Sequence, residues 1–256
     1  MKAVLLCGGF GTRLGGETQL RPKPMVEIGG KPILWHIMKI YEKHKINDFQ
    51  LALGYKSNFI KDYFTKYYSL NNDFSVNLKS GNVDYIDEIN ENWNIDLIDT
   101  GLETMTGGRL LRLKESLKNE QTFMLTYGDG VSNIDLTKLL QFHKSHGKIA
   151  TVTAVRPPVR FGELIIDDNS KVEEFAEKPQ AGKGWINGGF FVFNKEIFNY
   201  IENDSIMLER EPLEKLSKTG ELMAYKHHGF WQCMDTIREK EILEKLWNSN
   251  NAKWLK

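Results

Sequence analysis

A glycine-rich turn and two basic residues near the start of the chain could bind phosphate. An apolar run over residues 3–7 leads into residues 8–13, which read GGFGTR. Glycines let the backbone come close to a ligand and turn its N–H groups toward it, as in loops that hold phosphates. Arg13 can donate two hydrogen bonds to a phosphate, and Lys23 is a compact charge held between two prolines. These residues together point to a nucleoside triphosphate.

Two common phosphate motifs do not fit this turn. A Walker loop ends in Gly-Lys-Ser/Thr, whereas residues 11–13 read GTR. The dinucleotide fingerprint needs a third glycine where this chain has Leu14, and an arginine inside the turn suits a free triphosphate better than a pyrophosphate diester. The alternative interpretation is a tight strand-to-loop turn that only needs positive φ angles, which would leave Arg13 and Lys23 without a purpose.

Two aspartates are candidate metal ligands. Asp129 follows the apolar run 123–127 and lies between two glycines. In parallel sheets ligands bind at the carboxyl ends of strands, and a carboxylate there would repel a triphosphate unless a divalent cation lay between them. Mg²⁺ takes one or two protein carboxylates plus phosphate oxygens, and Asp235 could be the second. The alternatives are a simple turn aspartate for Asp129 and a helix N-cap for Asp235.

Three short loops carry residues suited to a phosphorylated sugar. In residues 177–179, EKP, Lys178 could hold a second phosphate while Glu177 accepts bonds from sugar hydroxyls. Asn187 precedes two glycines and an apolar strand, and Gly162 lies in a loop where the main chain could pass close to a ligand. Each signal is weak by itself, and a solvated surface turn is the competing interpretation of residues 177–179.

Composition limits the class of protein. A chain of 256 residues suits one large α/β domain, and its 34 basic and 34 acidic residues give no net charge, which removes the electrostatic argument for nucleic acid or a membrane surface. No apolar stretch approaches the roughly 20 residues of a membrane span. Two cysteines without metal-ligand spacing, and no signal peptide, predict a cytoplasmic protein.

The pattern of apolar residues predicts the elements that position these side chains. Strands and helices alternate in the first half, with strands at 3–7, 49–53, 97–98, 123–127 and 149–155 and helices from Pro32 and around 59–67, 110–117 and 136–143. Residues 69–95 are polar and indicate an insertion or an irregular β segment. The second half is richer in strands (164–166, 172–175, 190–193) and closes with a helix that turns Ile237, Ile242, Leu243 and Leu246 inward. We expect a single α/β domain with a Rossmann-like, mostly parallel sheet and helices on both faces.

The motifs in this order resemble those of the sugar-1-phosphate nucleotidyltransferases. The order is GGFGTRL, PKPM, GDG, FG, EKP, NGG and a tryptophan loop ending in Asp235, and it covers nearly the whole chain. The likeness is greatest to the branch that acts on CTP and glucose 1-phosphate, and it rests on residues 23–38, 99–109, 126–130, 186–191 and 230–236. Cys7 stands where the family usually has alanine, and residues 102–104 vary near the expected base. Trp231 precedes Asp235 by four residues, a spacing that favours the cytidylyl over the thymidylyl branch.

The resemblance implies a reaction in which glucose 1-phosphate attacks the α-phosphorus of CTP, giving CDP-glucose and pyrophosphate. It implies that Lys23 and Arg13 are catalytic, that Asp129 and Asp235 hold Mg²⁺, and that Gly162, Glu177, Lys178 and Asn187 bind the sugar phosphate. The residues it assigns to the nucleotide are Leu6, Cys7, Gly8, Gly9, Phe10, Gly11, Thr12, Arg13, Lys23, Thr104, Arg109 and Gly128.

The resemblance also implies the nucleotide-diphospho-sugar transferase fold, in which residues 1–135 mainly bind the nucleotide and residues 136–256 the sugar phosphate. It further implies a homo-oligomer, with a hexamer as the expected form, and a role in nucleotide sugars for bacterial surface polysaccharides such as lipopolysaccharide. Three alternatives stay open: a uridylyl- or thymidylyltransferase, a non-catalytic nucleotide-sugar sensor on the same scaffold, and a dinucleotide oxidoreductase. The presence of Lys23, Asp129 and Asp235 argues against the non-catalytic sensor. Leu14 in place of the third glycine argues against the oxidoreductase.

Overall fold

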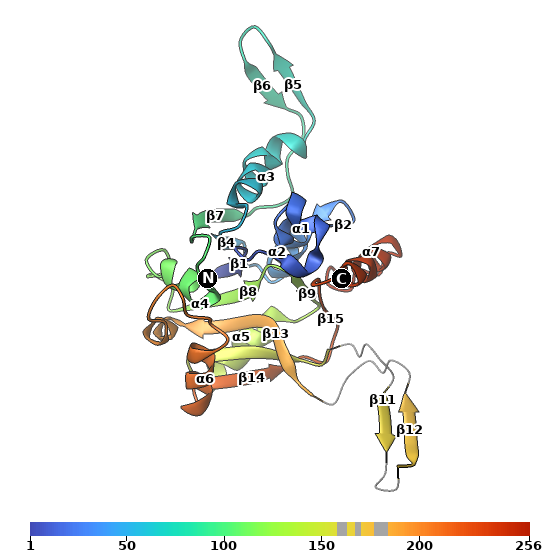
Figure 1. The fold of residues 1–256 in the computed structure, drawn as a ribbon. Helices are drawn as coiled ribbons and strands as arrows, with labels where there is room; N and C mark the ends of the chain where they lie inside the picture. Colours follow the sequence, from blue (N-terminus) through green and yellow to red (C-terminus); the bar gives the residue numbers. More distant parts are fainter. Residues whose placement is uncertain (158–162, 167–169, 177–183) are drawn as a thin grey trace.

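A seven-stranded sheet forms the centre of the computed structural model, which describes residues 1–157, 163–166, 170–176 and 184–256 (Figure 1). The predicted Gly162, Glu177 and Lys178 lie outside the described residues. In spatial order the strands are β14 (Leu222–Lys226), β10 (Ala150–Val155), β13 (Ile186–Asn194), β8 (Thr122–Tyr127), β1 (Lys2–Leu6), β4 (Asp48–Leu53) and β7 (Asn94–Asp99).

Most neighbouring strands in the sheet are parallel. β8, β1, β4 and β7 run in one direction, β14 is parallel to β10, and β13 is antiparallel to both β10 and β8. Leu6 pairs with Tyr127, so β1 and β8 end at the same edge of the sheet. That register brings the glycine-rich turn after β1 beside the residues that follow β8.

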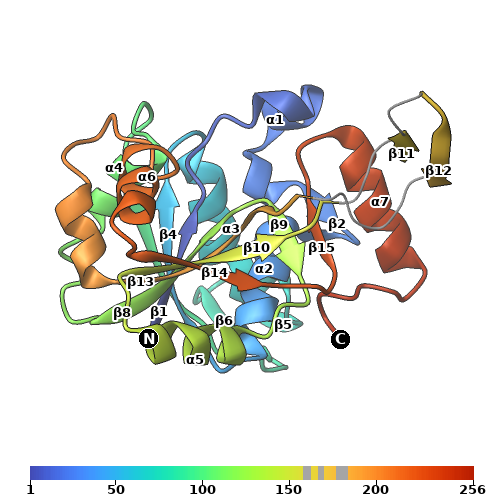
Figure 2. The same cartoon turned by 90° about the horizontal axis from the view of Figure 1, so that it is seen from below.

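Helices cover both faces of the sheet (Figure 2). Along β1, Ala3 and Leu5 belong to one hydrophobic core while Val4 and Leu6 belong to the other, as expected where side chains alternate across a sheet buried on both sides. The first core takes side chains from α2 (Ile33–Glu42), α3 (Ser57–Leu70), α5 (Leu136–His146) and α7 (Ile237–Asn248), and the second from α4 (Thr106–Arg112), α6 (Glu211–Lys218) and the 3₁₀ helix η3 (Lys195–Tyr200). The predicted fold class is confirmed.

Shorter elements surround the sheet. A hairpin of β5 (Phe74–Asn77) and β6 (Asn82–Tyr85) projects well away from the body beyond α3, within the polar segment for which an insertion or irregular β structure was expected (Figure 1). The remaining elements are η1 (Thr12–Leu14), α1 (Gly16–Leu20), η2 (Lys23–Met25) and the strand pairs β2 (Glu27–Ile28) with β3 (Lys31–Pro32), β9 (Gly130–Ser132) with β15 (Trp231–Cys233), and β11 (Glu163–Ile166) with β12 (Val172–Ala176). None of the helices in the described ranges has the length and apolar character that a membrane crossing requires.

The expectation for the last helix is partly wrong. Leu243 is fully buried, but Ile237 and Ile242 are 45% and 37% exposed. The helix begins at Ile237, which lies in its first turn at the surface, and the buried stripe continues instead through Leu246 and Trp247. Helix α6 was not predicted, because only three of its eight residues are buried and most of the others are charged.

Candidate functional site

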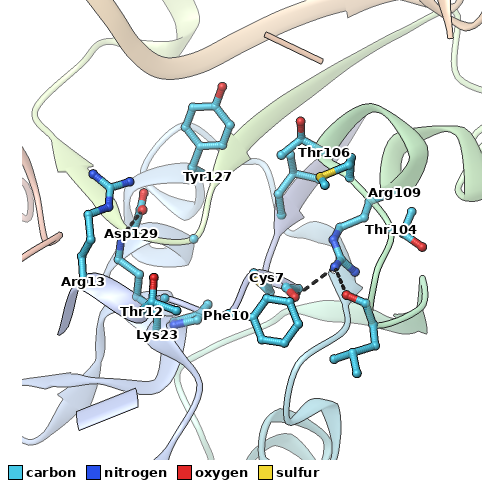
Figure 3. A pocket seen from close by; sticks show the side chains of 18 of the residues that line it. Cys7, Phe10, Thr12, Arg13, Lys23, Thr104, Thr106, Arg109, Tyr127 and Asp129 are labelled. Carbon is cyan, nitrogen blue, oxygen red and sulfur yellow. Dashed lines mark hydrogen bonds and ion pairs between the residues drawn. The ribbon is translucent and has the colours of Figure 1, made fainter. Parts of the chain in front are cut away.

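A cavity of about 410 Å³ opens at the edge of the sheet where β1 and β8 end. One side of the cavity is lined by Lys23, Arg13 and Asp129 (Figure 3). The opposite side is lined by Thr104, Thr106 and Arg109. The structure thus brings together every residue that the sequence assigned to the nucleotide and both candidate metal ligands. Those residues are Leu6, Cys7, Gly8, Gly9, Phe10, Gly11, Thr12, Arg13, Lys23, Thr104, Arg109, Gly128, Asp129 and Asp235.

The glycine-rich turn is held by backbone contacts and close packing. The amide of Cys7 donates to the carbonyl of Ala52 at 2.9 Å, which extends the β1–β4 ladder by one residue. Gly11 has a φ of +65°, in the left-handed region that favours glycine, and a Cβ there would lie 2.9 Å from the Cβ of Lys23. The turn therefore needs glycine at this position to bring Lys23 under the loop.

Lys23 links the two candidate metal ligands. Its Nζ lies 2.5 Å from Asp129 Oδ2 and also donates to Asp235 Oδ1, and Arg13 Nη1 lies 2.8 Å from Asp235 Oδ2. Burial lowers the pKa of Lys23, but the carboxylates of Asp129 and Asp235 outweigh it and raise the pKa above its ordinary value. Lys23 is therefore charged at neutral pH, with its ammonium directed into the cavity beside both carboxylates.

A two-stranded ladder brings Asp235 to Asp129. β15 pairs with β9 so that Cys233 lies opposite Gly130, and the amide of Met234 donates to the carbonyl of Asp129 at 2.8 Å. The N-cap of α7 is Thr236, in a capping box with Glu239, so the alternative role of Asp235 as the helix cap is wrong. The carboxylate of Asp235 is left to face Lys23 and Arg13.

The arrangement of carboxylates fits a divalent cation that is shared with phosphates. Asp129 and Asp235 approach one ammonium from two sides, so both are near enough to bind one cation. Within the described ranges no three or more His, Cys, Asp and Glu side chains gather into a metal site. Two carboxylates open to a cavity are the donor set expected for Mg²⁺ that completes its shell with phosphate oxygens and water.

Arg109 is bound to the protein itself. Its guanidinium is buried and donates to the carbonyl oxygens of Leu53, Gly101, Gly8 and Leu102 and to the hydroxyl of Thr100, at 2.7–3.1 Å. Arg109 lines the cavity, and its hydrogen bonds tie the turn after β1 to the loop that carries Thr104, which gives it a positioning role. Its contact with the nucleotide stays a prediction. Cys7 is likewise buried, which raises the pKa of its thiol, so its part in the cavity wall is structural.

Asn187 is adjacent to the cavity rather than in its wall. Its Nδ2 donates to the hydroxyl of Tyr127 at 3.2 Å, and Tyr127 lines the cavity. Trp231 Nε1 donates to the carbonyl of Gly188 at 2.7 Å, which fixes the turn next to Asn187. Of the four residues predicted to bind the sugar phosphate, Asn187 is the one that lies within the described residues.

The sequence did not single out Tyr127 or Thr106 among the residues of this wall, nor Glu209 behind them. Tyr127 and Thr106 line the cavity, and both donate hydrogen bonds to the carboxylate of Glu209. Burial and the Glu209 carboxylate raise the pKa of Tyr127, so its hydroxyl keeps its proton. Tyr127 could have been predicted as a site residue because it directly precedes Gly128. The sequence around Glu209 gives no such signal, because its partner Tyr127 lies 82 residues earlier in the chain.

Comparisons with known proteins agree with this geometry. The model of the nucleotidyl transferase family matches residues 2–236. The glucose-1-phosphate cytidylyltransferase of Salmonella typhi is 50% identical over 99% of this chain and 98% of its own length, and the probable glucose-1-phosphate cytidylyltransferase of Bacillus subtilis is 44% identical over 99% of both. Among solved structures, HddC from Yersinia pseudotuberculosis has a TM-score of 0.71 at 25% identity and covers 96% of this chain and 99% of its own. The chain therefore belongs to the nucleotidyl transferase family, and its similarity over nearly the full length is to the glucose-1-phosphate cytidylyltransferases within it.

Proposed function

We propose that this protein transfers CMP from CTP to glucose 1-phosphate, giving CDP-glucose and pyrophosphate. The observation that carries the proposal is the 50% identity over 99% of the chain to the glucose-1-phosphate cytidylyltransferase of Salmonella typhi. The cavity supports it, since a glycine-rich turn, Arg13, Lys23 and two carboxylates meet there, as nucleotidyl transfer requires. The relatives at 44–50% identity described above are cytidylyltransferases, which favours this reaction over the uridylyl and thymidylyl alternatives.

In the proposed reaction an oxygen of the sugar phosphate attacks the α-phosphorus in line. A new P–O bond forms there, and the bond from the α-phosphorus to the bridging oxygen breaks, so that the electron pair leaves with pyrophosphate. The backbone N–H groups of the turn and Arg13 would bind the β- and γ-phosphates and neutralise the charge that develops on the leaving group. Lys23 would stabilise the charge at the α-phosphoryl oxygens, which makes it and Arg13 the catalytic residues.

We assign Mg²⁺ to Asp129 and Asp235. When bound, the ion supplies charge neutralisation and Lewis acidity at phosphate oxygens. The ammonium of Lys23 would then pair with the phosphates instead of the two carboxylates, inside the same cavity. Gly162, Glu177 and Lys178 remain proposed partners of the sugar phosphate, with Asn187 on the hexose and the sugar-side residues drawn mainly from 136–256.

The base would lie against the walls that Arg109 connects. Gly8, Gly9 and Gly128 would let the base approach the backbone, and Thr104 faces the same space from the loop that leads into α4. A Cβ on Gly8 would lie 2.2 Å from the guanidinium of Arg109, so that wall tolerates no side chain without moving Arg109. Backbone groups that hydrogen-bond the amine of cytosine would reject uracil strongly, because they would be left unpaired.

A product assay tests the proposed reaction. Purified protein with CTP, glucose 1-phosphate and Mg²⁺ should release pyrophosphate and form CDP-glucose in equal amounts, and omission of either substrate should abolish both. The products can be followed by phosphorus NMR. Release of inorganic phosphate, or of pyrophosphate without glucose 1-phosphate, would rule the reaction out.

We also propose that the protein is a homo-oligomer, in the first instance a hexamer, and that the β5–β6 hairpin contributes to its contacts. The hairpin carries exposed apolar side chains on a projecting element, among them Phe74, Val76 and Leu78. A monomer gains nothing from exposing them, whereas a second copy of the chain could bury them. Replacing residues 74–85 by a short glycine-serine linker should lower the mass measured by light scattering, and an unchanged mass would contradict the assignment.

A cytoplasmic location and a role in supplying nucleotide sugar for bacterial surface polysaccharide are part of the same proposal. Both cysteines are free thiols, Cys7 buried and Cys233 partly so, which suits a reducing compartment. CDP-glucose is an activated sugar, so the reactions that consume it must modify the hexose or transfer it to an acceptor.

A further inference from the structure

Glu209 receives hydrogen bonds from two residues that line the cavity. The hydroxyl of Tyr127 donates to its Oε1 at 2.7 Å, and the hydroxyl of Thr106 donates to its Oε2 at 2.6 Å. Tyr127 ends β8, Thr106 begins α4, and Glu209 comes from the segment before α6. One carboxylate therefore connects three separate parts of the chain behind the cavity wall.

The backbone fixes the direction of every proton in this network. The amide of Gly189 can only donate, and it donates to Asn187 Oδ1 at 2.8 Å, so the Nδ2 of Asn187 must be the group that faces Tyr127. Tyr127 accepts from Asn187 and must donate onward to Glu209. On the other side the amide of Leu208 donates to Thr106 Oγ1 at 2.9 Å, so Thr106 also donates to Glu209.

Two chains of donors thus converge on one group that accepts at both ends. An ionised carboxylate has two acceptor oxygens and no proton, so it satisfies both hydroxyls at once. A carboxamide of the same shape cannot do so, because its NH₂ group would face either Tyr127 or Thr106. In either orientation one hydroxyl proton loses its acceptor, and the group left unpaired is partly buried.

We infer that Glu209 is a positioning residue for the sugar side of the cavity, where it holds Tyr127 and Asn187 in the orientation that presents an N–H donor to the hexose. The second hydrogen of Asn187 Nδ2 is not used by Tyr127, and Asn187 is exposed at the cavity margin. With Glu209 accepting from Tyr127, that hydrogen points outward as a donor to a sugar hydroxyl. Glu209 itself does not touch the substrate.

The inference rests on the proposed function, since it assigns the hexose to this wall. Its consequence is specific to one substrate. Removing the acceptor that Glu209 provides should lower the affinity for glucose 1-phosphate and for CDP-glucose. The turn after β1, Lys23 and the two aspartates are held by other contacts, so binding of CTP should stay as it is.

The test is Glu209→Gln, with Glu221→Gln as the matched control. Glu221 also pairs with groups of its own surroundings, Lys148 and the amide of Ile149, but it precedes β14 at the opposite edge of the sheet. We expect E209Q to raise KM for glucose 1-phosphate about tenfold, the effect of one lost hydrogen bond near a charged group, with KM for CTP unchanged within twofold. E221Q should change neither constant.

A second variant separates positioning from general loosening. Tyr127→Phe should raise KM for glucose 1-phosphate similarly, and adding E209Q to it should cause less than a further threefold change, because the relay is already broken. Equal rises in both KM values, no rise in either, or an undiminished effect of E209Q in the Y127F background would overturn the inference.

Calorimetric binding of CDP-glucose and of CTP gives the same comparison without turnover. E209Q should weaken CDP-glucose about tenfold and leave CTP unchanged, whereas equal affinities for CDP-glucose in wild type and variant would overturn the inference. Absence of CDP-glucose synthesis by the wild type would instead refute the proposed function, so the two failures are distinguishable.

Discussion

Replacing Lys23 by methionine should lower kcat/KM for the synthesis of CDP-glucose by about a thousandfold, the upper part of the range for removing one preorganised group that stabilises transition-state charge. Methionine keeps the length and apolar stem of lysine, so it removes mainly the ammonium. In the structure that ammonium is the only group that touches both Asp129 and Asp235 among the contacts of the described residues. The measurement is steady-state pyrophosphate release with each substrate varied in turn.

The matched control for this variant is Lys31→Met. Lys31 lies in β3, shortly after the η2 segment that carries Lys23, but its Nζ donates to Asn71 outside the cavity. It should leave kcat/KM within about threefold of wild type. A K23M enzyme within tenfold of wild type would mean that Lys23 has no part in the chemistry.

The same variant has an effect on stability with a definite sign. Without the ammonium, Asp129 and Asp235 are two anions facing one space, and their mutual repulsion lowers stability. A divalent cation should relieve that repulsion. The melting temperature of K23M should therefore rise on addition of Mg²⁺ by more than that of wild type, in which Lys23 already occupies the position between the carboxylates.

Replacing Arg109 by lysine should have the largest effect on stability among single changes in the cavity wall. Arg109 is only 4% exposed, and its guanidinium satisfies five oxygens of four backbone carbonyls and Thr100. A lysine has three donors on a point charge, so at least two buried acceptors lose their partner at about 1–3 kcal/mol each. We expect unfolding to become easier by roughly 3–5 kcal/mol, which is a fall in Tm of about 10 °C for a chain of this size.

Arg112→Lys is the control for that change, because it lies on the same helix and alters the same residue type. Its guanidinium pairs with Asp204 at the surface, where an ion pair contributes about 1 kcal/mol or less. R112K should shift Tm by no more than 2–3 °C by the same scaling. We also expect R109K to raise KM for CTP. An R109K protein with the same Tm as R112K and a wild-type KM for CTP would show that the link between Gly8 and Leu102 does not stabilise the cavity wall.

Local patterns in the sequence predicted much of the site because its main parts follow strand ends. The turn after β1 and Asp129 after β8 each adjoin a run of apolar residues, and strands of a parallel sheet end at one edge. Once the fold class is right, such residues must meet. Asp235 was predicted from its place in the family pattern, and the β9–β15 ladder explains how it reaches Asp129.

The rest of the site depends on contacts between distant segments, which no local pattern encodes. Arg109 was expected at the nucleotide because it lies in the right segment, but its partners come from residues 8, 53 and 100–102, and only the fold brings those carbonyls around one guanidinium. Glu209 was missed for the same reason. The last helix shows a smaller version of this limit, since the apolar residue at its start, Ile237, lies where a new helix leaves the surface and is exposed.

The choice of base tests the central claim most directly. Wild-type protein is mixed with glucose 1-phosphate, Mg²⁺ and equal concentrations of CTP, UTP, dTTP and GTP, and the nucleotide sugars are separated by chromatography. The proposed function predicts CDP-glucose in excess over every other product by more than about a hundredfold, because a wall that hydrogen-bonds cytosine leaves polar groups unpaired with the other bases. UDP-glucose or dTDP-glucose in comparable amounts, or no nucleotide sugar at all, would contradict it.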